Sequence, residues 1–230
     1  MPSSPLIQAV GVKKVYKRGS EKIVALRDTS LDVLSGEFIV IIGPSGSGKS
    51  TLLHLLGGID RPTEGELCVN GLNLIAASEA ALTRFRRDNL GFVFQFYNLL
   101  PSLNALDNVI LPLLAKGMSW KASRARGAAI LELVGLSHRQ KHTPGQLSGG
   151  EQQRVAIARA MVVEPCVILA DEPTGDLDSA SADSIIALMV DLNQRLGVTF
   201  IVATHNLTLL QVASRSYELV DGHLNPKSGG

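Results

Sequence analysis

The sequence EFIVIIGPSGSGKST, residues 37–51, joins an apolar run to a loop of glycine and serine and then to the start of a helical pattern. Residues 43–51 fit the phosphate-binding pattern G-x-x-x-x-G-K-[ST]. Glycines at fixed places let the backbone curl until its N–H groups point at phosphate oxygens. The pattern requires a strand before it and a helix after it, and both are predicted here, so we expect a nucleotide phosphate site.

Each part of this loop has an expected task. Lys49 is expected to reach the terminal phosphates, and the Ser50 hydroxyl is expected to ligate Mg²⁺. The helix predicted over 49–57 presents its positive N-terminus to the same phosphates. The expected nucleotide contacts are the whole run Gly43, Pro44, Ser45, Gly46, Ser47, Gly48, Lys49, Ser50 and Thr51.

Two further apolar runs resemble the first, VILAD at 167–171 and TFIVATH at 199–205. Continuous apolar strands are typical of a parallel sheet that is covered on both faces. Helical patterns at 148–163 and 179–196 alternate with these runs, which predicts an α/β fold. Ligands of such sheets bind beyond the carboxyl ends of the strands, and each run here ends in polar residues.

The remaining segments predict two additions to this parallel core. The N-terminal segment and residues 65–74 alternate apolar and polar positions, which predicts a small antiparallel β-layer. Helical patterns broken by proline and glycine predict an inserted helical lobe. We expect one domain with three parts: the core with its β-layer at about 1–90 and 155–224, the helical lobe at about 91–154, and a flexible tail at 225–230.

Asp171 and Glu172 stand side by side at the end of the second apolar run. Adjacent residues of a strand point to opposite faces, so these two carboxylates need not share one task. In P-loop nucleotide hydrolases an acid at this place helps to hold Mg²⁺, which fits Asp171. Glu172 is then the candidate general base that activates a water molecule. The alternative is a surface glutamate that opens the loop before Pro173.

The composition argues against several classes of protein. The 230 residues contain 22 Lys and Arg against 21 Asp and Glu, a net charge of +1, which argues against a dedicated nucleic-acid surface. Cys68 and Cys166 form no CxxC pair and predict neither a metal site nor a disulfide framework. No apolar run reaches a membrane-spanning length and the N-terminus lacks a signal-peptide pattern, so we expect a cytosolic chain.

A third motif, QLSGGEQQRVAIARA at 146–160, separates the possible P-loop classes. Together with the P-loop and VILADEPT at 167–174, it resembles the ATP-binding cassette family of ATPases, and the resemblance covers about residues 6–224. The resemblance implies a P-loop α/β core with a β-layer and a helical lobe, hydrolysis of ATP, and bound ATP and Mg²⁺. A P-loop kinase or a GTPase switch would leave LSGGEQQR unexplained.

The sequence LSGGE at 147–151 resembles the family signature, with Glu151 in place of the usual glutamine. In the family this segment contacts the γ-phosphate held by a second copy, which implies that role for Ser148, Gly149 and Gly150. Ser148 and Glu151 also have the spacing of a capping box at a helix start. A negative side chain beside a phosphate is unfavourable, so we expect Glu151 to turn back toward the cap.

Four more residues match functional positions of the family. The resemblance implies that Gln95 contacts Mg²⁺ or the attacking water and that His205 lies near the γ-phosphate, so both join Glu172 as catalytic candidates. It also implies that Asp178 helps to couple the two sites of a dimer and that Tyr16 stacks on adenine. Taken without the resemblance, Gln95, His205 and Tyr16 each have a purely structural alternative.

Three residues near these motifs carry no assigned chemistry. Asp176 stands where related sequences often have asparagine, which leaves its local contacts open. Arg154 and Arg159 lie on the helix predicted after the signature, and we expect them to be solvated or ion-paired rather than catalytic.

Two further runs indicate a branch of the family: STLLHLLGGIDRPTEGEL at 50–67 and FQFYNLLPSLNALDNVILPLL at 94–114. They are similar to the ATPases that serve lipoprotein-release, macrolide-efflux and cell-division permeases, the LolD/MacB/FtsE-like branch. This similarity implies a head-to-tail homodimer closed by ATP that drives a separate permease at the cytoplasmic face of the inner or plasma membrane. The alternative is a soluble cassette ATPase of DNA repair or translation, which typically has coiled-coil insertions, CxxC pairs or tandem cassettes.

The apolar run that follows Gln95 is the expected contact with the permease. Part of this run must belong to the core of the lobe. We expect Tyr97, Leu100 and Leu103 to be exposed and to help form a groove for a short amphipathic helix of the permease.

Overall fold

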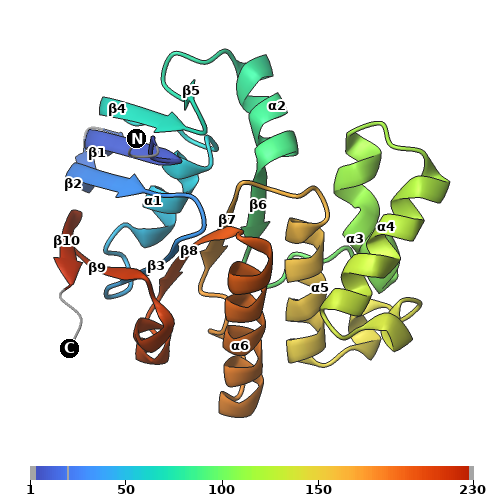
Figure 1. The fold of residues 1–230 in the computed structure, drawn as a ribbon. Coiled ribbons are helices and arrows are strands. Elements are labelled where there is room, and N and C mark those ends of the chain that lie inside the picture. The colour runs from blue at the N-terminus through green and yellow to red at the C-terminus, as the bar shows by residue number, and fades with distance from the viewer. Residues whose placement is uncertain (1–3, 20, 228–230) are drawn as a thin grey trace.

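The continuous apolar runs form the middle of a six-stranded sheet (Figure 1). β3 (Phe38–Ile42) and β7 (Val167–Asp171) both pair in parallel with β8 (Thr199–Thr204), and every residue of β3 and β8 is buried. The order is β10-β9-β3-β8-β7-β6, in which β10 is antiparallel to β9. The predicted α/β class is confirmed. The outer strands are β6 (Leu90–Val93), β9 (Arg215–Val220) and β10 (His223–Lys227).

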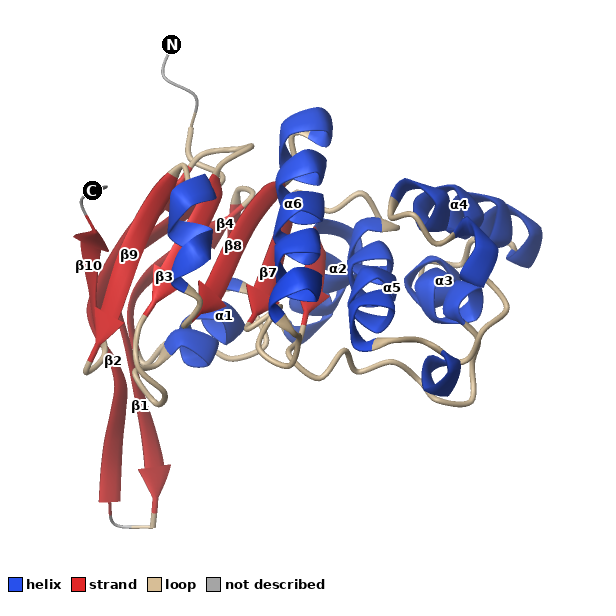
Figure 2. Cartoon of the chain, turned by 90° about the horizontal axis from the view of Figure 1, so that it is seen from below, coloured by secondary structure: helices blue, strands red, loops and turns tan. Residues whose placement is uncertain are grey.

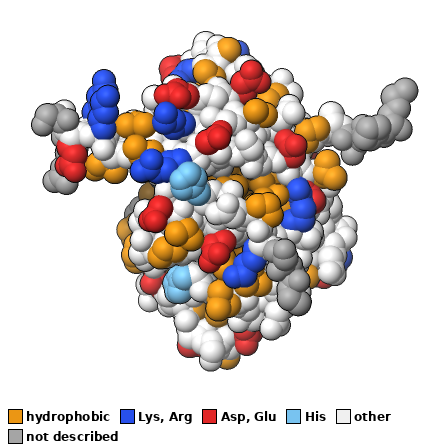
Figure 3. All heavy atoms as spheres, turned by 90° about the vertical axis from the view of Figure 1, so that its left-hand side faces the viewer, with side chains coloured by type: hydrophobic (Ala, Val, Ile, Leu, Met, Phe, Trp, Pro, Cys, Tyr) orange, Lys and Arg blue, Asp and Glu red, His pale blue; other side chains and the backbone are white. Residues whose placement is uncertain are grey.

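The predicted antiparallel layer packs on one side of this sheet. Its order is β2-β1-β4-β5, with antiparallel pairing throughout. β1 and β2 form a long hairpin that extends beyond the rest of the molecule (Figure 2), and charged side chains of both signs are interspersed with apolar ones on this side (Figure 3). The bounds are β1 (Ile7–Arg18), β2 (Glu21–Val33), β4 (Glu64–Val69) and β5 (Leu72–Asn73).

The central sheet separates two hydrophobic cores, because successive residues of a strand face opposite sides. Phe38 and Val40 of β3 lie in the core that contains the helices of the lobe and α6 (Ser179–Leu196). Ile39 and Ile41 lie in the core between the sheet, the β-layer and α1 (Lys49–Leu56). Each face of the sheet is therefore covered, as the continuous apolar strands require.

The helical lobe consists of three helices that pack on one another, α3 (Ala105–Ala115), α4 (Trp120–Leu133) and α5 (Gly149–Met161). α2 (Glu79–Asn89) belongs instead to the β-layer side, where Leu82 and Phe85 are buried. Three 3₁₀ turns complete the helical elements of the described residues: Ser137–Arg139, Pro144–Gln146 and Leu207–Val212.

Three predicted boundaries differ from the structure, a computed structural model that describes residues 4–19 and 21–227. The lobe, predicted to end at about 154, continues to Met161 because α5 is one uninterrupted helix. Residues 91–93, predicted to open the helical lobe, form part of β6 and pair with β7. Residues 225–227, predicted to be a flexible tail, form part of β10 and pair with β9, while 228–230 lie outside the described residues. Both strand segments are short, and their order comes from a neighbouring strand that local sequence does not reveal.

No helix within the described residues is long and apolar enough to cross a membrane. The longest helix, α6, has 18 residues and carries charged side chains along its length.

Gly127 of α4 lies where that helix meets α3, and a substitution at this position tests how tightly the two helices pack. A Cβ atom there would overlap Ile110 Cγ2 and approach Leu106 Cδ1 to 2.9 Å. Gly127→Ala gains about 1 kcal/mol of helix propensity, but overpacking a core costs about 1–3 kcal/mol. We expect urea unfolding to show a net loss of about 1 kcal/mol.

The matched control is Gly145→Ala, because a Cβ atom at Gly145 would meet nothing within 4 Å. This variant should keep the wild-type free energy of unfolding. A Gly127→Ala variant that is more stable than wild type would contradict the close packing of α3 on α4.

Candidate nucleotide site

The phosphate-binding loop follows β3 directly and leads into α1. Gly46 and Gly48 have φ angles of 79° and 107°, which residues with a Cβ atom rarely adopt. A Cβ atom at Gly48 would also overlap the carbonyl oxygen of Ala25 in β2. The buried hydroxyl of Ser47 has no hydrogen-bond partner among the described residues. A curled loop with an unpaired buried hydroxyl suits a polar ligand such as a phosphate group.

Lys49 lies across this loop. Its Nζ donates hydrogen bonds to the carbonyl oxygens of Gly43 at 2.7 Å and Pro44 at 3.1 Å. The same Nζ lies 3.8 Å from Oε1 of Glu172. The positive charge of Lys49 is thus held at the mouth of the loop, balanced by two carbonyl dipoles and one carboxylate.

Glu172 lies between Lys49 and His205. Its Oε2 is 2.9 Å from Nδ1 of His205 and accepts a hydrogen bond from the backbone N–H of the same histidine at 3.1 Å. The side chain is 16% exposed, so the carboxylate lies within the site and does not extend into solvent. The φ of Glu172 is 46°, an uncommon conformation for a residue with a side chain. Such strain is frequent at functional sites and costs about 1–3 kcal/mol.

The three expected Mg²⁺ ligands come from three elements. Ser50 lies in the first turn of α1, and Asp171 ends β7. Gln95 follows β6, and its Nε2 donates a hydrogen bond to Oδ1 of Asp176 at 3.2 Å. That bond uses the amide nitrogen and leaves the amide oxygen for a metal ion. Hydroxyl, carboxylate and amide oxygens are the donors that Mg²⁺ prefers, so this set fits the ion.

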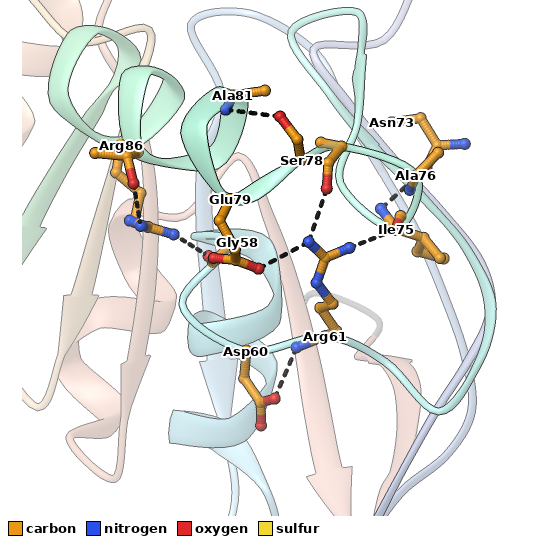
Figure 4. Close-up of polar contacts among 12 residues, drawn as sticks. Gly58, Asp60, Arg61, Asn73, Ile75, Ala76, Ser78, Glu79, Ala81 and Arg86 are labelled. Atoms are coloured by element: carbon orange, nitrogen blue, oxygen red, sulfur yellow. Dashed lines mark hydrogen bonds and ion pairs between the residues drawn. The ribbon is translucent and has the colours of Figure 1, made fainter.

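Tyr16 is anchored through Asp60, which lies in the loop after α1. The hydroxyl of Tyr16 donates to Oδ2 of Asp60 at 2.9 Å, and Lys14 binds Oδ1 at 2.6 Å. Burial and the hydrogen bond to Asp60 raise the pKa of Tyr16 above its ordinary value of 10.0, so the ring stays neutral. Arg61 holds this loop in place by donating to Asp60 from its backbone N–H and to the carbonyl oxygen of Ile75 from its side chain (Figure 4).

The signature segment begins α5 as a complete capping box. The backbone N–H of Ser148 donates to Glu151 at 2.8 Å, and the N–H of Glu151 donates to the Ser148 hydroxyl at 3.3 Å. Arg139 adds a bond to Oε1 of Glu151 at 2.9 Å. The prediction that Glu151 turns back to the cap is confirmed. The Ser148 N–H and Arg139 lower the pKa of Glu151 below its ordinary value of 4.5.

Asp178 forms the N-cap of α6. Its Oδ1 accepts from the backbone N–H of Ser181 at 3.0 Å, and its Oδ2 accepts from the Ser181 hydroxyl at 2.7 Å. The residue is exposed, so it remains on the surface beside the turn that carries Glu172.

Arg159 has a role that the sequence did not predict. It donates to the carbonyl oxygens of Tyr97 at 2.7 Å and Asn98 at 2.6 Å, two successive residues with φ of 57° and 48°. The guanidinium thus holds the turn that follows Gln95, and burial lowers the pKa of Arg159 below its ordinary value. Arg154 similarly donates to the Val134 carbonyl oxygen and the Ser184 hydroxyl. Among the described residues neither arginine forms an ion pair, and both are partly exposed, so each instead holds neutral groups of neighbouring segments.

The apolar run after Gln95 is exposed in part. Leu100 is 47% exposed, as predicted, and Phe96 is 72% exposed. Tyr97 and Leu103 are half-buried, so the prediction of their exposure is wrong. The buried amide of Asn108 donates to the Leu103 carbonyl oxygen and holds that residue against α3, and Arg159 holds the Tyr97 backbone.

Comparison with known proteins identifies the family. The ABC transporter family model matches residues 26–175. The chain belongs to the ABC transporter family. It is therefore an ATPase that binds nucleotide, as the resemblance implied.

Similar proteins cover nearly the whole chain. The lipoprotein-releasing system ATP-binding protein LolD of Alcanivorax borkumensis is 47% identical over 222 residues, which are 96% of this chain and 97% of that protein. LolD of Coxiella burnetii is 46% identical over 99% of this chain and 98% of its own length. These relatives confirm the predicted branch.

A solved structure shares the fold as well. The dimeric post-hydrolysis state of the ATP-binding cassette MJ0796, bound to ADP and Pi, superimposes with a TM-score of 0.88 at 43% identity and covers 96% of this chain and 97% of that one. The predicted ATPase fold, with its β-layer and helical lobe, is thus confirmed.

The capping box gives a test that depends on pH. Glu151→Gln keeps a side-chain oxygen for the Ser148 N–H but loses the negative charge at the start of α5 and beside Arg139. Because the pKa of Glu151 is lowered on folding, its carboxylate stabilises the protein above the unfolded pKa and loses this effect as pH falls through the folded value. We expect the variant to be less stable by about 0.3–1 kcal/mol at neutral pH.

Urea unfolding between about pH 7 and pH 4 measures the difference between the two proteins. The difference should narrow as pH falls below about 4.5. A gap that stays constant or widens toward low pH would show that the charge of Glu151 does not stabilise the helix start.

Proposed function

We propose that this chain is the ATP-hydrolysing subunit of a lipoprotein-releasing transporter, in which two copies close on ATP and drive a separate permease. The observation that carries the proposal is the placement of Glu172, whose carboxylate lies 2.9 Å from His205 and 3.8 Å from Lys49 at the mouth of the phosphate loop. The names of the LolD relatives support the lipoprotein-releasing role.

Each residue of the site has a separate role in hydrolysis. Bound MgATP would supply the phosphoanhydride bond that is cleaved, and its metal ion would offset phosphate charge. The backbone of residues 43–51 and the Lys49 ammonium would hold the phosphates, while Ser50, Asp171 and Gln95 would supply oxygen ligands for Mg²⁺. Glu172 accepts a proton from the attacking water, and His205 fixes the orientation of the Glu172 carboxylate.

Two copies are needed to complete each nucleotide site. The phosphate loop surrounds a phosphate group from one side, and α5 with its signature segment lies apart from α1 in both views of the chain (Figures 1 and 2). A second copy placed head-to-tail would present Ser148, Gly149 and Gly150 to the nucleotide, with the helix N-terminus favouring negative charge. The dimeric structures of MJ0796 support an arrangement of two copies. A symmetric head-to-tail pair would bring Asp178 near the interface.

A cavity between the core and the lobe is the proposed contact with the permease. It has a volume of about 520 Å³ and is lined by residues of α2, β6, α3, α5 and the turn after Gln95. Its walls include Phe92 and Phe94 together with Arg86, Arg87 and Arg159. This combination fits a short helix of the permease with apolar side chains and an acidic residue. Such a contact would hold the chain at the cytoplasmic face of the membrane.

The first functional prediction concerns Glu172. Glu172→Gln keeps the size of the side chain but removes the base, so turnover should fall by about 10²–10⁴ while MgATP binding is retained. Steady-state hydrolysis and equilibrium nucleotide binding measure the two effects separately. Asp171→Asn should additionally raise the Mg²⁺ concentration needed for binding. Wild-type turnover by Glu172→Gln, with the permease present, would refute the assignment of the base.

The same variant tests dimer closure. With ATP, Glu172→Gln should elute from size exclusion as a dimer, because the γ-phosphate contacts of both signature segments persist. With ADP it should elute mainly as a monomer. The same elution volume in both nucleotides would contradict ATP-driven closure.

The second functional prediction concerns the cavity. Ala115 is an exposed residue at the end of α3 that lines the cavity. Ala115→Glu places a bulky carboxylate where the permease helix is proposed to bind, so co-purification with the permease should be lost. Hydrolysis by the isolated subunit should be unchanged.

The matched control is Ala125→Glu, an exposed alanine of α4 in the same lobe that does not line the cavity. This variant should co-purify with the permease as wild type does. If Ala115→Glu does so as well, the permease binds elsewhere.

A further inference from the structure

Gln153 is a fully buried polar residue on α5, the helix that begins with the signature segment. Its side chain is 0% exposed, and its Nε2 donates to the carbonyl oxygen of Pro173 at 2.7 Å. Its Oε1 is also buried and has no partner among the described residues. Pro173 follows Glu172 directly in the chain, so this buried amide contacts the turn that carries the proposed base.

The orientation of the amide follows from its partner. A proline carbonyl oxygen can only accept, so the nitrogen of Gln153 must face it and the oxygen must face away. A buried acceptor left unpaired is unfavourable, and an apolar side chain of similar size would avoid that cost. The hydrogen bond to Pro173 is therefore the best explanation for a polar residue at this buried position.

Among the described residues, the backbone of the turn after β7 (residues 172–177) makes two hydrogen bonds to other elements. Its first residue, Glu172, has a left-handed backbone that is held when its N–H donates to the carbonyl oxygen of Ala203 in β8 at 2.8 Å. Within the turn, the N–H of Gly175 donates to the carbonyl oxygen of Glu172 at 3.1 Å. Gln153 supplies a bond from the opposite side, because α5 belongs to the lobe and β8 to the core sheet.

We propose that Gln153 is a positioning residue for hydrolysis: its bond to Pro173 ties α5 to the turn of Glu172 and sets the direction of the Glu172 carboxylate. α5 is a rigid helix, so a shift of its N-terminus moves Gln153 as well. In the head-to-tail dimer the start of α5 contacts the nucleotide of the second copy. The same bond therefore links the occupancy of one nucleotide site to the geometry of Glu172 in the other. This inference rests on the proposed dimer and on Glu172 as the base.

The test compares two neighbouring glutamines of α5. Gln153→Met keeps the length of the side chain and loses the donor. Gln152→Met is the matched control, because Gln152 is half-buried and bonds the Leu147 carbonyl oxygen, away from the turn. We expect Gln153→Met to lower kcat at least about tenfold, as small misplacements of a reacting group do. Its KM for MgATP and its ATP-dependent dimerisation should stay within about twofold of wild type, because a change that affects only the chemical step leaves nucleotide binding intact. Gln152→Met should keep the wild-type kcat.

A second variant separates positioning from mere packing and remains informative if Gln153→Met folds poorly. Gln153→Glu offers a neutral carboxyl that can donate to Pro173 at low pH and an ionised one that repels the carbonyl oxygen at high pH. Burial raises the pKa of such a carboxyl, so its ionisation falls within the pH range of the assay. The ratio of its kcat to that of wild type should rise as pH is lowered from about 8 to about 6. A packing role alone predicts a ratio independent of pH.

The outcomes distinguish the inference from the proposed function. A wild-type kcat for Gln153→Met, or a pH-independent ratio for Gln153→Glu, overturns the inference if Glu172→Gln is inactive. If Glu172→Gln retains turnover, the proposed base is wrong and the inference is overturned with it. If Glu172→Gln fails to dimerise with ATP, the link between two sites is overturned, and a loss of kcat in Gln153→Met then supports positioning within one chain alone.

Discussion

The parallel register of β3, β8 and β7 is the constraint on which the nucleotide site depends. Ile42 at the end of β3 lies beside Thr204 of β8, and Ala203 lies beside Asp171 of β7. Three strands therefore end at the same edge of the sheet, and each continues into a functional segment. Because both faces of this sheet are buried, a shift of register by one residue would move each side chain of a strand into the opposite core as well as displace the site.

Charge at this edge is balanced by short polar contacts. Lys49 is 8% exposed, and two carbonyl oxygens together with Glu172 compensate its charge. Glu172 in turn accepts a hydrogen bond from the backbone N–H of His205, and its Oε2 lies 2.9 Å from the imidazole Nδ1. An isolated buried charge would be costly, so the basic and acidic groups of the site stabilise one another. The same contacts hold the carboxylate beside the mouth of the phosphate loop.

α5 connects the separate parts of the molecule. Its first turn is the signature segment, which Ser148 and Glu151 cap. Further along the helix, Gln153 bonds the turn of Glu172, and Arg159 bonds the turn after Gln95. One helix thus contacts both the turn that carries Glu172 and the turn that follows Gln95. The lobe and the core are therefore joined at both turns by hydrogen bonds to backbone carbonyl oxygens.

The sequence by itself determined the local features of this protein. The phosphate loop, the buried strands and the capping box of Ser148 and Glu151 each depend on residues within a few positions of one another, so their patterns predict them. The tertiary structure decided the contacts of Gln153, Arg159 and Asp176, the placement of residues 91–93 in β6, and the burial of Tyr97. The partners of Arg159 are backbone carbonyls 61 and 62 residues away, and a carbonyl group is the same in every residue. No residue type in the sequence marks such a partner, so only the packing of α5 against the turn after Gln95 could reveal it.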